Sequence, residues 1–430
     1  MIMFLLYVSI DDILVLSVQT IFFHMLGELL IGCIIGLVLG IVSGCTPGIH
    51  SNTMAGILLG LHPALLILFG PLVFAVSVTA TLVTHTFLDA VPSTFLGVPD
   101  PDTAIAVLPA HALCMKGLGE EAVRISALGS LAGAAFGIIL FPFFFIFLPP
   151  LQQYLNWWIG LLLICVAGLL IVKSSAPEWA AVVFIASGIL GSFSMAYSHL
   201  SWAILPGGSP LLLPLLTGLF GVPVLLKGAE GTVPEQRYTG IRMSRREAAG
   251  SACAGTIAGA IVGWMPGLSN ATANAVLASF ISYTKAGRGY ILATGAANTA
   301  NAFLGIAALY ALSRVRNGAM AAVATEELPP LIMIMGAACI AALAAYPLTL
   351  LASKGSRFLT RLNIRRLNLM VIISLIALTA IITGPFGLLI LALATAIGLV
   401  PPLVSVQRVF CMGAIMVPIM CWSIIGVPLF

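Results

Sequence analysis

Residues 36–48 read GLVLGIVSGCTPG, and the pattern recurs at residues 255–267 as GTIAGAIVGWMPG. In both copies, three glycines at four-residue intervals precede a Pro-Gly pair, and the copies lie 219 residues apart. A threonine follows each copy at the same distance, as Thr53 and Thr272. Such a match at one fixed offset indicates an internal repeat, so we expect two related halves.

Each copy predicts a helix that is interrupted at its Pro-Gly pair. Glycines four residues apart lie on one face of a helix and let another helix approach closely. Proline then removes a hydrogen-bond donor, and glycine permits the unusual dihedral angles that follow. Inside a membrane, such free backbone is tolerated only where it is packed in protein or lines a wet cavity. Paired interruptions in two halves are typical of the binding sites of secondary transporters.

The composition is that of a membrane protein. The chain is 60% hydrophobic and 7% charged, with a mean hydropathy of +1.15, whereas soluble domains are about 25% charged. We therefore expect an all-α polytopic membrane protein with about 10–12 spans. The eight cysteines include no Cys-x-x-Cys pair, which disfavours a metal cage or a disulfide framework. We expect no cofactor other than Na+ or H+ as a coupling ion.

The basic residues divide the chain and give the repeats an orientation. We expect an N-terminal half at 1–226, a basic cytoplasmic loop at 227–247 and a C-terminal half at 248–430. No lysine or arginine precedes Lys116, whereas the second copy follows directly on a basic cluster. By the positive-inside rule, the chain enters the first copy from outside the cell and the second copy from the cytoplasm. The two repeats are therefore predicted to have inverted topology, with broken helices in each.

Other segments depart from a simple span. Residues 2–20 are interrupted by two aspartates and predict a short interfacial helix. Pro71 is expected to break the apolar run around it, and the four prolines within 89–117 forbid one continuous helix. That stretch is too apolar for a solvent loop, so a re-entrant hairpin is predicted. One span is expected near 318–350.

Small polar residues near the interruptions and the hairpin form the predicted substrate site. Part of this set recurs, because Ser93-Thr94-Phe95-Leu96-Gly97 is echoed 208 residues later by Asn301-Ala302-Phe303-Leu304-Gly305. These side chains and the freed backbone would line a site at the middle of the membrane. The alternative is that they cap broken helices and satisfy hydrogen bonds between helices. The predicted substrate-binding residues are Pro47, Gly48, Ser51, Asn52, Thr53, Ser93, Thr94, Pro266, Gly267, Ser269, Asn270, Thr272, Asn274, Asn298 and Asn301.

Three carboxylates are predicted to couple transport to a cation: Asp89, Asp100 and Asp102. Carboxylates inside a membrane are costly to bury and usually functional. The alternative is that the hairpin reaches water and its aspartates are simply solvated. His50 and His85 could relay protons, but a lone histidine among apolar residues is more often a packing residue.

An enzymatic role is not favoured. The chain lacks the His-Glu-x-x-His motif of zinc proteases. The sequence around Ser269 could form the turn of an intramembrane serine protease, but the duplication explains that segment better. Asp100 and Asp102 are too close in the chain for two facing catalytic carboxylates. The alternatives that remain open are a passive channel, a non-transport membrane enzyme and a scaffold subunit.

With these motifs the chain resembles the large permease subunit of the tripartite tricarboxylate transporters, in a compact form similar to archaeal members. The resemblance rests on both Pro-Gly motifs, on PSTFLGVP at 92–99 and on KGLGEEAVRISALGS at 116–130. It implies a multi-pass permease of the cytoplasmic membrane that takes up carboxylates with Na+ or H+ and works by elevator-like alternating access. The two Pro-Gly pairs would be backbone turns at the substrate site.

The resemblance also implies partners. In this family a small membrane subunit and an extracytoplasmic solute-binding protein assist the permease. Besides these, the carboxylate substrate and the lipid bilayer, we expect a homo-oligomer and no nucleic acid. The chain departs from the family pattern at His50 and Ser269, where glycine is usual, and at Asp100 and Asp102, where the hairpin is typically neutral. The added negative charge favours cation coupling or a substrate other than citrate.

Overall fold

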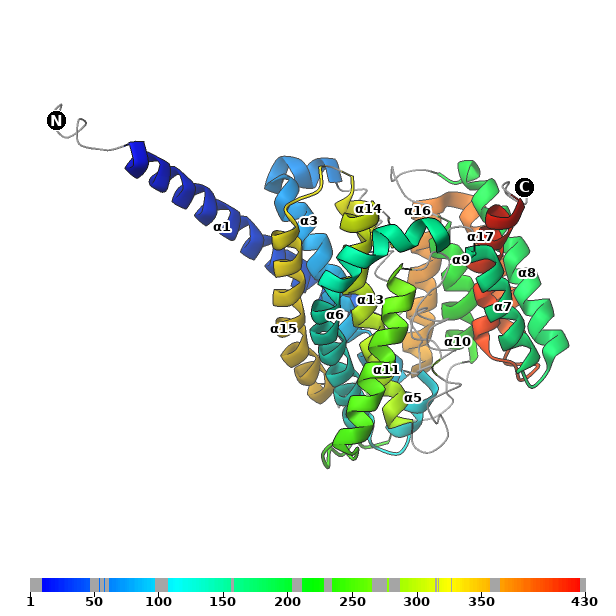
Figure 1. Cartoon of the computed structure of the whole chain (residues 1–430). Coiled ribbons are helices and arrows are strands. Elements are labelled where there is room, and N and C mark those ends of the chain that lie inside the picture. Colours follow the sequence, from blue (N-terminus) through cyan, green and yellow to red (C-terminus); the bar gives the residue numbers. More distant parts are fainter. Residues whose placement is uncertain are drawn as a thin grey trace.

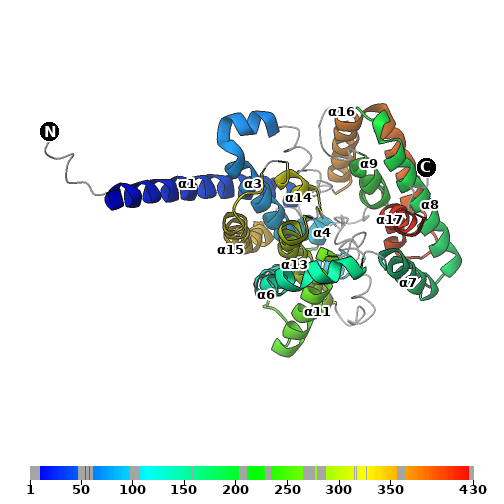
Figure 2. The ribbon, with the colours of Figure 1, turned by 45° about the horizontal axis from the view of Figure 1, so that its top comes forward.

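The structure, a computed structural model, is built from helices, and its described residues include no strand. It describes residues 10–46, 54, 58, 62–96, 107–155, 158–202, 211–227, 234–264, 277, 287–313, 315, 317–325, 327–355 and 364–425. The helices form two bundles, which lie side by side in Figures 1 and 2. Few contacts join described helices of different bundles, but hydrophobic clusters connect them, because Leu96, Tyr290, Ala293 and Ala297 of the first bundle pack among residues of the second.

Each half of the sequence supplies helices to both bundles. The first bundle contains α1 (Ile10–Cys45), α3 (His62–Leu88), α4 (Ala90–Leu96), α5 (Val107–Cys114), α6 (Gly119–Leu155), α11 (Arg245–Trp264), α13 (Arg288–Leu312), α14 (Gly318–Val323) and α15 (Leu331–Gly355). The second bundle contains α7 (Ile159–Val172), α8 (Pro177–Ala196), α9 (Leu212–Leu216), a π-helical turn (Thr217–Gly221), α10 (Val222–Lys227), α16 (Ile364–Leu399) and α17 (Gly413–Ile425). The chain therefore passes from the first bundle to the second, returns to the first and ends in the second.

The two glycine ladders make equivalent contacts. In the first copy α1 packs on α3, and a Cβ added at Gly36 would lie 2.5 Å from the Cβ of Ala80. In the second copy α11 packs on α13, and a Cβ at Gly259 would collide with the backbone of Ala297. Residues without side chains allow helices to approach this closely. The close packing that the ladders predict is therefore confirmed in both halves.

A third set of small residues joins the two halves within the first bundle. Added Cβ atoms at Gly129 and Gly133 of α6 would collide with the backbone of Leu292 and Ala296 of α13. In return, a Cβ at Gly295 of α13 would lie 2.5 Å from a carbonyl oxygen of α6. Because α6 belongs to the first half and α13 to the second, the first bundle is built from both.

Prolines break the helices where the sequence predicts. α3 is interrupted at Gly70, which has a φ of +80° and directly precedes Pro71. α16 is interrupted in the same way at Gly384, with a φ of +69° before Pro385. The proline-rich stretch 89–117 forms two short helices, α4 and α5, and the segment between them lies outside the described residues.

Two predictions are wrong in detail. Residues 10–20 do not form a separate interfacial helix, because they are the beginning of α1, which continues to Cys45. Figures 1 and 2 show the beginning of α1 reaching beyond the bundle. The predicted span 318–350 is two helices, because α14 ends at Val323 and the pair Pro329-Pro330 precedes α15.

The described helices suit a membrane. Six are long and apolar enough to cross one, and four shorter apolar helices of 10–17 residues accompany them. Large apolar side chains such as Ile34, Ile139 and Ile332 are exposed on the outside of the first bundle. Such a surface is expected where the solvent is lipid. The protein is therefore an all-α polytopic membrane protein.

Candidate functional site: buried polar contacts between α3 and α13

Many of the predicted site residues lie outside the described part of the chain. These are Pro47, Gly48, Ser51, Asn52, Thr53, Asp100, Asp102, Pro266, Gly267, Ser269, Asn270, Thr272 and Asn274. The structure places the others, which are Asp89, Ser93, Thr94, Asn298 and Asn301, on or beside α3, α4 and α13.

Asp89 lies between the end of α3 and the start of α4 and contacts the second half of the chain. Its Oδ2 accepts a hydrogen bond of 2.8 Å from Nδ2 of Asn298 on α13. Each of the two residues is 4% exposed. Burying a carboxylate among apolar helices is costly unless hydrogen bonds or a positive charge compensate it. The fold thus brings a predicted ion-coupling residue onto a predicted substrate-binding residue 209 positions away.

The two predicted residues of α4 extend this site. Ser93 Oγ donates a hydrogen bond of 2.9 Å to the carbonyl oxygen of Asp89, which ties the first turn of α4 to the backbone of Asp89. Thr94 is buried, and its carbonyl oxygen lies 2.9 Å from Nδ1 of His111 on α5. The first residue therefore supports Asp89 directly, and the second joins α4 to α5.

Hydroxyl groups form a second contact between α3 and α13, one turn before Asp89. Thr86 Oγ1 donates to the carbonyl oxygen of Val83 at 2.8 Å and lies 3.0 Å from Oγ1 of Thr299. A hydroxyl carries one proton, so Thr299 is the donor in this pair. Ser130 of α6 lies beside it, with Oγ 3.2 Å from the carbonyl oxygen of Thr86 and 3.3 Å from that of Gly295.

Thr86 and Thr299 occupy equivalent positions with respect to the two ladders. The residues that face matching ladder glycines are Ala80 and Ala293, Thr84 and Ala297, and Leu88 and Asn301, with Leu304 also beside Gly263. Each of these pairs is 213 residues apart, as are Thr86 and Thr299. This register differs from the offset of 208 that the Phe-Leu-Gly echo predicts. The difference arises because Phe95 lies on the separate helix α4, whereas Phe303 continues α13.

His85 extends the buried polar row toward the first ladder. It is 3% exposed, and its Nδ1 lies 3.1 Å from Oγ of Ser43 on α1. Side chains four residues apart share one face of a helix, so His85 and Asp89 lie on the same side of α3. The polar row therefore runs from Ser43 beside the ladder, along α3, to Asn298 on α13.

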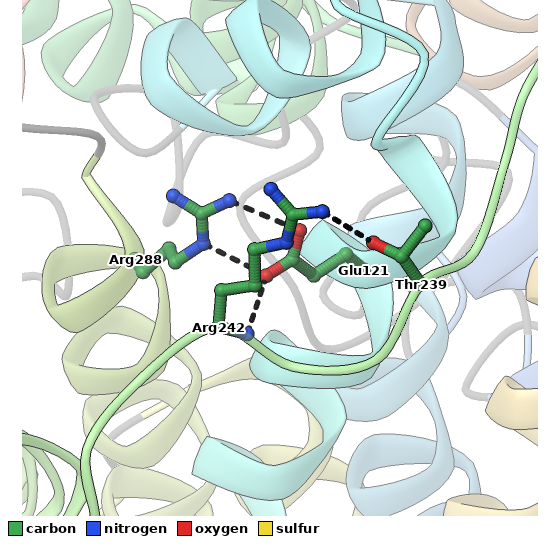
Figure 3. A network of polar contacts seen from close by, with 4 residues as sticks. All are labelled: Glu121, Thr239, Arg242 and Arg288. Atoms are coloured by element: carbon green, nitrogen blue, oxygen red, sulfur yellow. Dashed lines mark hydrogen bonds and ion pairs between the residues drawn. The ribbon is translucent and has the colours of Figure 1, made fainter.

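A buried ion-pair network joins the same two halves at the start of α6 and was missed in the sequence. Glu121 is fully buried and accepts hydrogen bonds of 2.8 and 3.0 Å from Nε and Nη2 of Arg288. The backbone N–H of Arg242 donates to the same carboxylate at 2.8 Å, and its guanidinium donates to Oγ1 of Thr239 (Figure 3). Arg288 is the first residue of α13, where the helix dipole disfavours positive charge. Glu121 offsets that charge and ties the beginning of α13 to the beginning of α6.

A sequence signal for this network did exist. Glu120 and Glu121 are adjacent acids in a chain that is 7% charged, and they follow a glycine that begins a helix. Glu120 pairs within α6, where Arg124 donates to it at 2.8 Å. The Arg124 guanidinium also lies 4.3 Å from the ring centre of Tyr238. The guanidinium of Arg124 is therefore held between a buried carboxylate and an aromatic ring.

Comparison with known proteins identifies the family to which the chain belongs. The model of the family described as "Tripartite tricarboxylate transporter TctA family" matches residues 30–413. The chain is 26% identical over 287 residues to "Uncharacterized protein MJ1079" of Methanocaldococcus jannaschii, an alignment that covers 64% of this chain and 70% of that protein. No solved structure matches the chain.

The matched range includes both glycine ladders, both Pro-Gly pairs and every contact between α3 and α13 described above. It agrees with the resemblance that the motifs indicate. The chain therefore belongs to the tripartite tricarboxylate transporter TctA family and is a membrane component of such a transporter.

Proposed function

We propose that the protein is a secondary-active permease that carries small organic anions such as carboxylates across the cell membrane, driven by Na+ or H+. The family works in tripartite systems with another membrane subunit and a solute-binding protein. We propose that this chain works with both and forms a homo-oligomer. The observation that carries the proposal is the buried contact between Asp89 and Asn298.

The chemistry around Asp89 suits a coupling cation. A carboxylate, a side-chain amide and threonine hydroxyls are the oxygen ligands that hard cations prefer. Asp89 is also buried in a membrane-spanning segment, where protonation would remove the cost of its charge. Either Na+ binding or proton uptake at Asp89 would therefore change the charge between α3 and α13. The two Pro-Gly segments, which lie outside the described residues, would supply backbone groups for an anionic substrate.

We infer that the two halves have inverted topology, related by an axis through Thr86 and Thr299. A contact between equivalent positions lies on the axis that relates them, and these two residues are equivalent in their register to the ladders. Thr86 contacts Thr299. Asp89 lies three residues after Thr86 and contacts Asn298, which lies one residue before Thr299. This order is that of antiparallel helices, which supports an axis in the membrane plane.

The separation into two bundles supports an elevator-like mechanism. The first bundle contains the buried polar row and both glycine ladders, whose close contacts make it a rigid unit. The described helices of the second bundle pack mainly on one another, and the hydrophobic core among them also takes in Tyr290, Ala293 and Ala297 of α13. We propose that the first bundle carries substrate and cation past the second.

Counterflow in proteoliposomes tests this function. The purified protein is reconstituted, loaded with unlabelled citrate and given labelled citrate outside, with Na+ exchanged for K+ and with a pH gradient as a separate condition. A carrier shows saturable uptake that rises with internal substrate, whereas a passive channel shows neither property. We expect Asp89→Asn to abolish uptake driven by either cation gradient.

Two further variants sharpen the test. Asn298→Ala removes a hydrogen bond to a charged group, worth about 1.5–3 kcal/mol, and is expected to lower uptake by about tenfold or more. Thr79→Val is the matched control, because Thr79 is equally buried in α3 but bonds within its own helix, to the carbonyl oxygen of Ala75 at 2.9 Å. Cation-driven uptake that survives in Asp89→Asn at the level of Thr79→Val would contradict the role of Asp89.

A further inference from the structure

A segment without helix or strand, residues 234–244, lies on the beginning of α6. It follows α10, which belongs to the second bundle, and leads directly into α11 of the first bundle. It is therefore part of the connection along which the chain returns from one bundle to the other. We call residues 234–244 the strap.

The strap is fixed to the first bundle at three successive points. The side chain of Gln236, which is 5% exposed, donates to the carbonyl oxygen of Cys114 at 3.0 Å and accepts from the N–H of Gly119 at 2.7 Å. The N–H of Arg237 donates to the carbonyl oxygen of Gly117 at 2.8 Å. The N–H of Arg242 donates to the buried carboxylate of Glu121, which also holds Arg288 (Figure 3).

The turn beneath the strap is shaped to receive it. Gly117 has a φ of +77°, a conformation that side-chain-bearing residues rarely adopt. A Cβ at this position would also lie 2.9 Å from the carbonyl oxygen of Glu235. The turn therefore needs glycine at position 117 for two reasons: the backbone conformation there and the close approach of the strap.

We propose that the strap is a permanent clasp, which keeps the beginnings of α6 and α13 together throughout the transport cycle and fixes the returning chain to the first bundle at Gln236. Its hydrogen bonds go to the end of α5, to the turn before α6 and to α6, and Met243 packs against a hydrophobic cluster that includes Ile291 and Leu292 of α13. The strap therefore moves with the first bundle. The part of this inference that concerns movement rests on the proposed elevator mechanism. Gln236 lies nine positions after the end of α10 at Lys227. A chain of that length reaches about 30 Å at most, which sets an upper limit on how far the two anchor points can separate.

Cys114 is a built-in reporter of the clasp. Its thiol is completely buried, and burial raises its pKa to about 12. The carbonyl oxygen of Cys114 and the N–H of Gly119 are the two groups that the Gln236 side chain covers. The thiol itself packs with Val91, Phe95 and Val123 of α4 and α6, so the closed clasp protects it by holding the turn in this packed position. A thiol buried in this way stays protonated and away from reagents, because the thiolate is the reactive form.

The experiment follows alkylation of Cys114 by N-ethylmaleimide in reconstituted protein whose other cysteines are replaced by serine. Labelling is measured with Na+ or K+, and with or without citrate. We expect Cys114 to stay unlabelled in every condition while the strap is intact. Gln236→Ala is expected to raise the labelling rate in all conditions alike. Glu235→Ala is the matched control, because this neighbouring strap side chain is 84% exposed and its ion pair, to Arg237, lies on the surface.

Two outcomes would overturn the clasp. Labelling of the intact strap protein that depends on cation or citrate would mean that the strap opens during the cycle. Equal labelling of Gln236→Ala and Glu235→Ala would mean that the strap does not protect the thiol of Cys114. The first measurement needs no change in the strap, so it holds even if Gln236→Ala fails to fold. Neither measurement requires transport, so the clasp and the proposed function can fail separately.

Discussion

Replacing Gly36 by alanine tests the contact on which both halves are built. The new Cβ would lie 2.5 Å from both the Cβ of Ala80 and the carbonyl oxygen of Ser77, whereas ordinary contacts begin at 3.4 Å. α1 and α3 would have to separate locally by the difference, about 0.9 Å, because the contacted atoms are backbone and a Cβ and cannot rotate away. Gly27 of the same helix is the matched control, because nothing lies within 4 Å of its added Cβ.

The two substitutions should change stability in opposite directions. Overpacking a tight contact costs about 1–3 kcal/mol, and replacing a helical glycine by alanine gains about 0.5–1 kcal/mol. Gly36→Ala is therefore expected to lose about 1–2 kcal/mol, whereas Gly27→Ala should gain about 0.5–1 kcal/mol.

Thermal unfolding of the detergent-purified protein, followed with a thiol-reactive dye, measures the difference. The dye reports unfolding through buried free thiols such as those of Cys33 and Cys411. We expect an apparent Tm below the wild-type value for Gly36→Ala and at or above it for Gly27→Ala. Equal Tm values for the two variants would refute the argument that the ladder glycines are needed for close approach.

The second half provides an independent repetition of the same experiment. A Cβ at Gly259 of α11 would collide with the backbone of Ala297, whereas nothing lies within 4 Å of one at Gly250 of the same helix. Gly259→Ala should therefore be less stable than Gly250→Ala. A difference in one half without the other would contradict the equivalence of the two ladders.

Two further predictions concern single side chains. Asn52→Ala and Asn270→Ala, in the segments that follow the two Pro-Gly pairs, are expected to abolish citrate uptake in proteoliposomes without loss of expression; normal uptake in both would contradict their assignment to the substrate site. For Cys114, whose pKa burial raises to about 12, alkylation in the protein with an intact strap should stay slow from pH 7 to pH 9. An ordinary thiol with a pKa of about 8.5 gains much of its thiolate over that range, so a comparable rise at Cys114 would show that the thiol is not buried.

Features of the fold that depend only on residues close together in the chain were predicted from the sequence. The ladder spacing predicted close helix packing, and Pro71 predicted the break in α3, because both effects act within a few residues. The same reasoning could have identified Gly129 and Gly133, which have the spacing of the ladders but no Pro-Gly pair after them to draw attention. Pro329-Pro330 is a helix-stop signal, and the prediction of a single span near 318–350 did not take it into account.

Contacts between distant parts of the chain were much less predictable. Asp89 and Asn298 were each recognised as polar residues in apolar segments, but nothing in the sequence indicates that they meet. Glu121 and Arg288 are 167 residues apart, and an ion pair leaves no periodic pattern. The interleaving of the halves in two bundles was hidden for the same reason, because hydropathy gives the order of the helices and not their neighbours.

The packing of α6 on α13 has a consequence for biosynthesis. Gly133 and Ala296 touch in the finished protein but are 163 residues apart, so α6 leaves the ribosome well before its partner exists. During that interval the small-residue face of α6 must be shielded by lipid or by the insertion machinery. An N-terminal fragment ending before α13 would therefore enter the membrane without completing its tertiary structure, and the first bundle can close only late in translation.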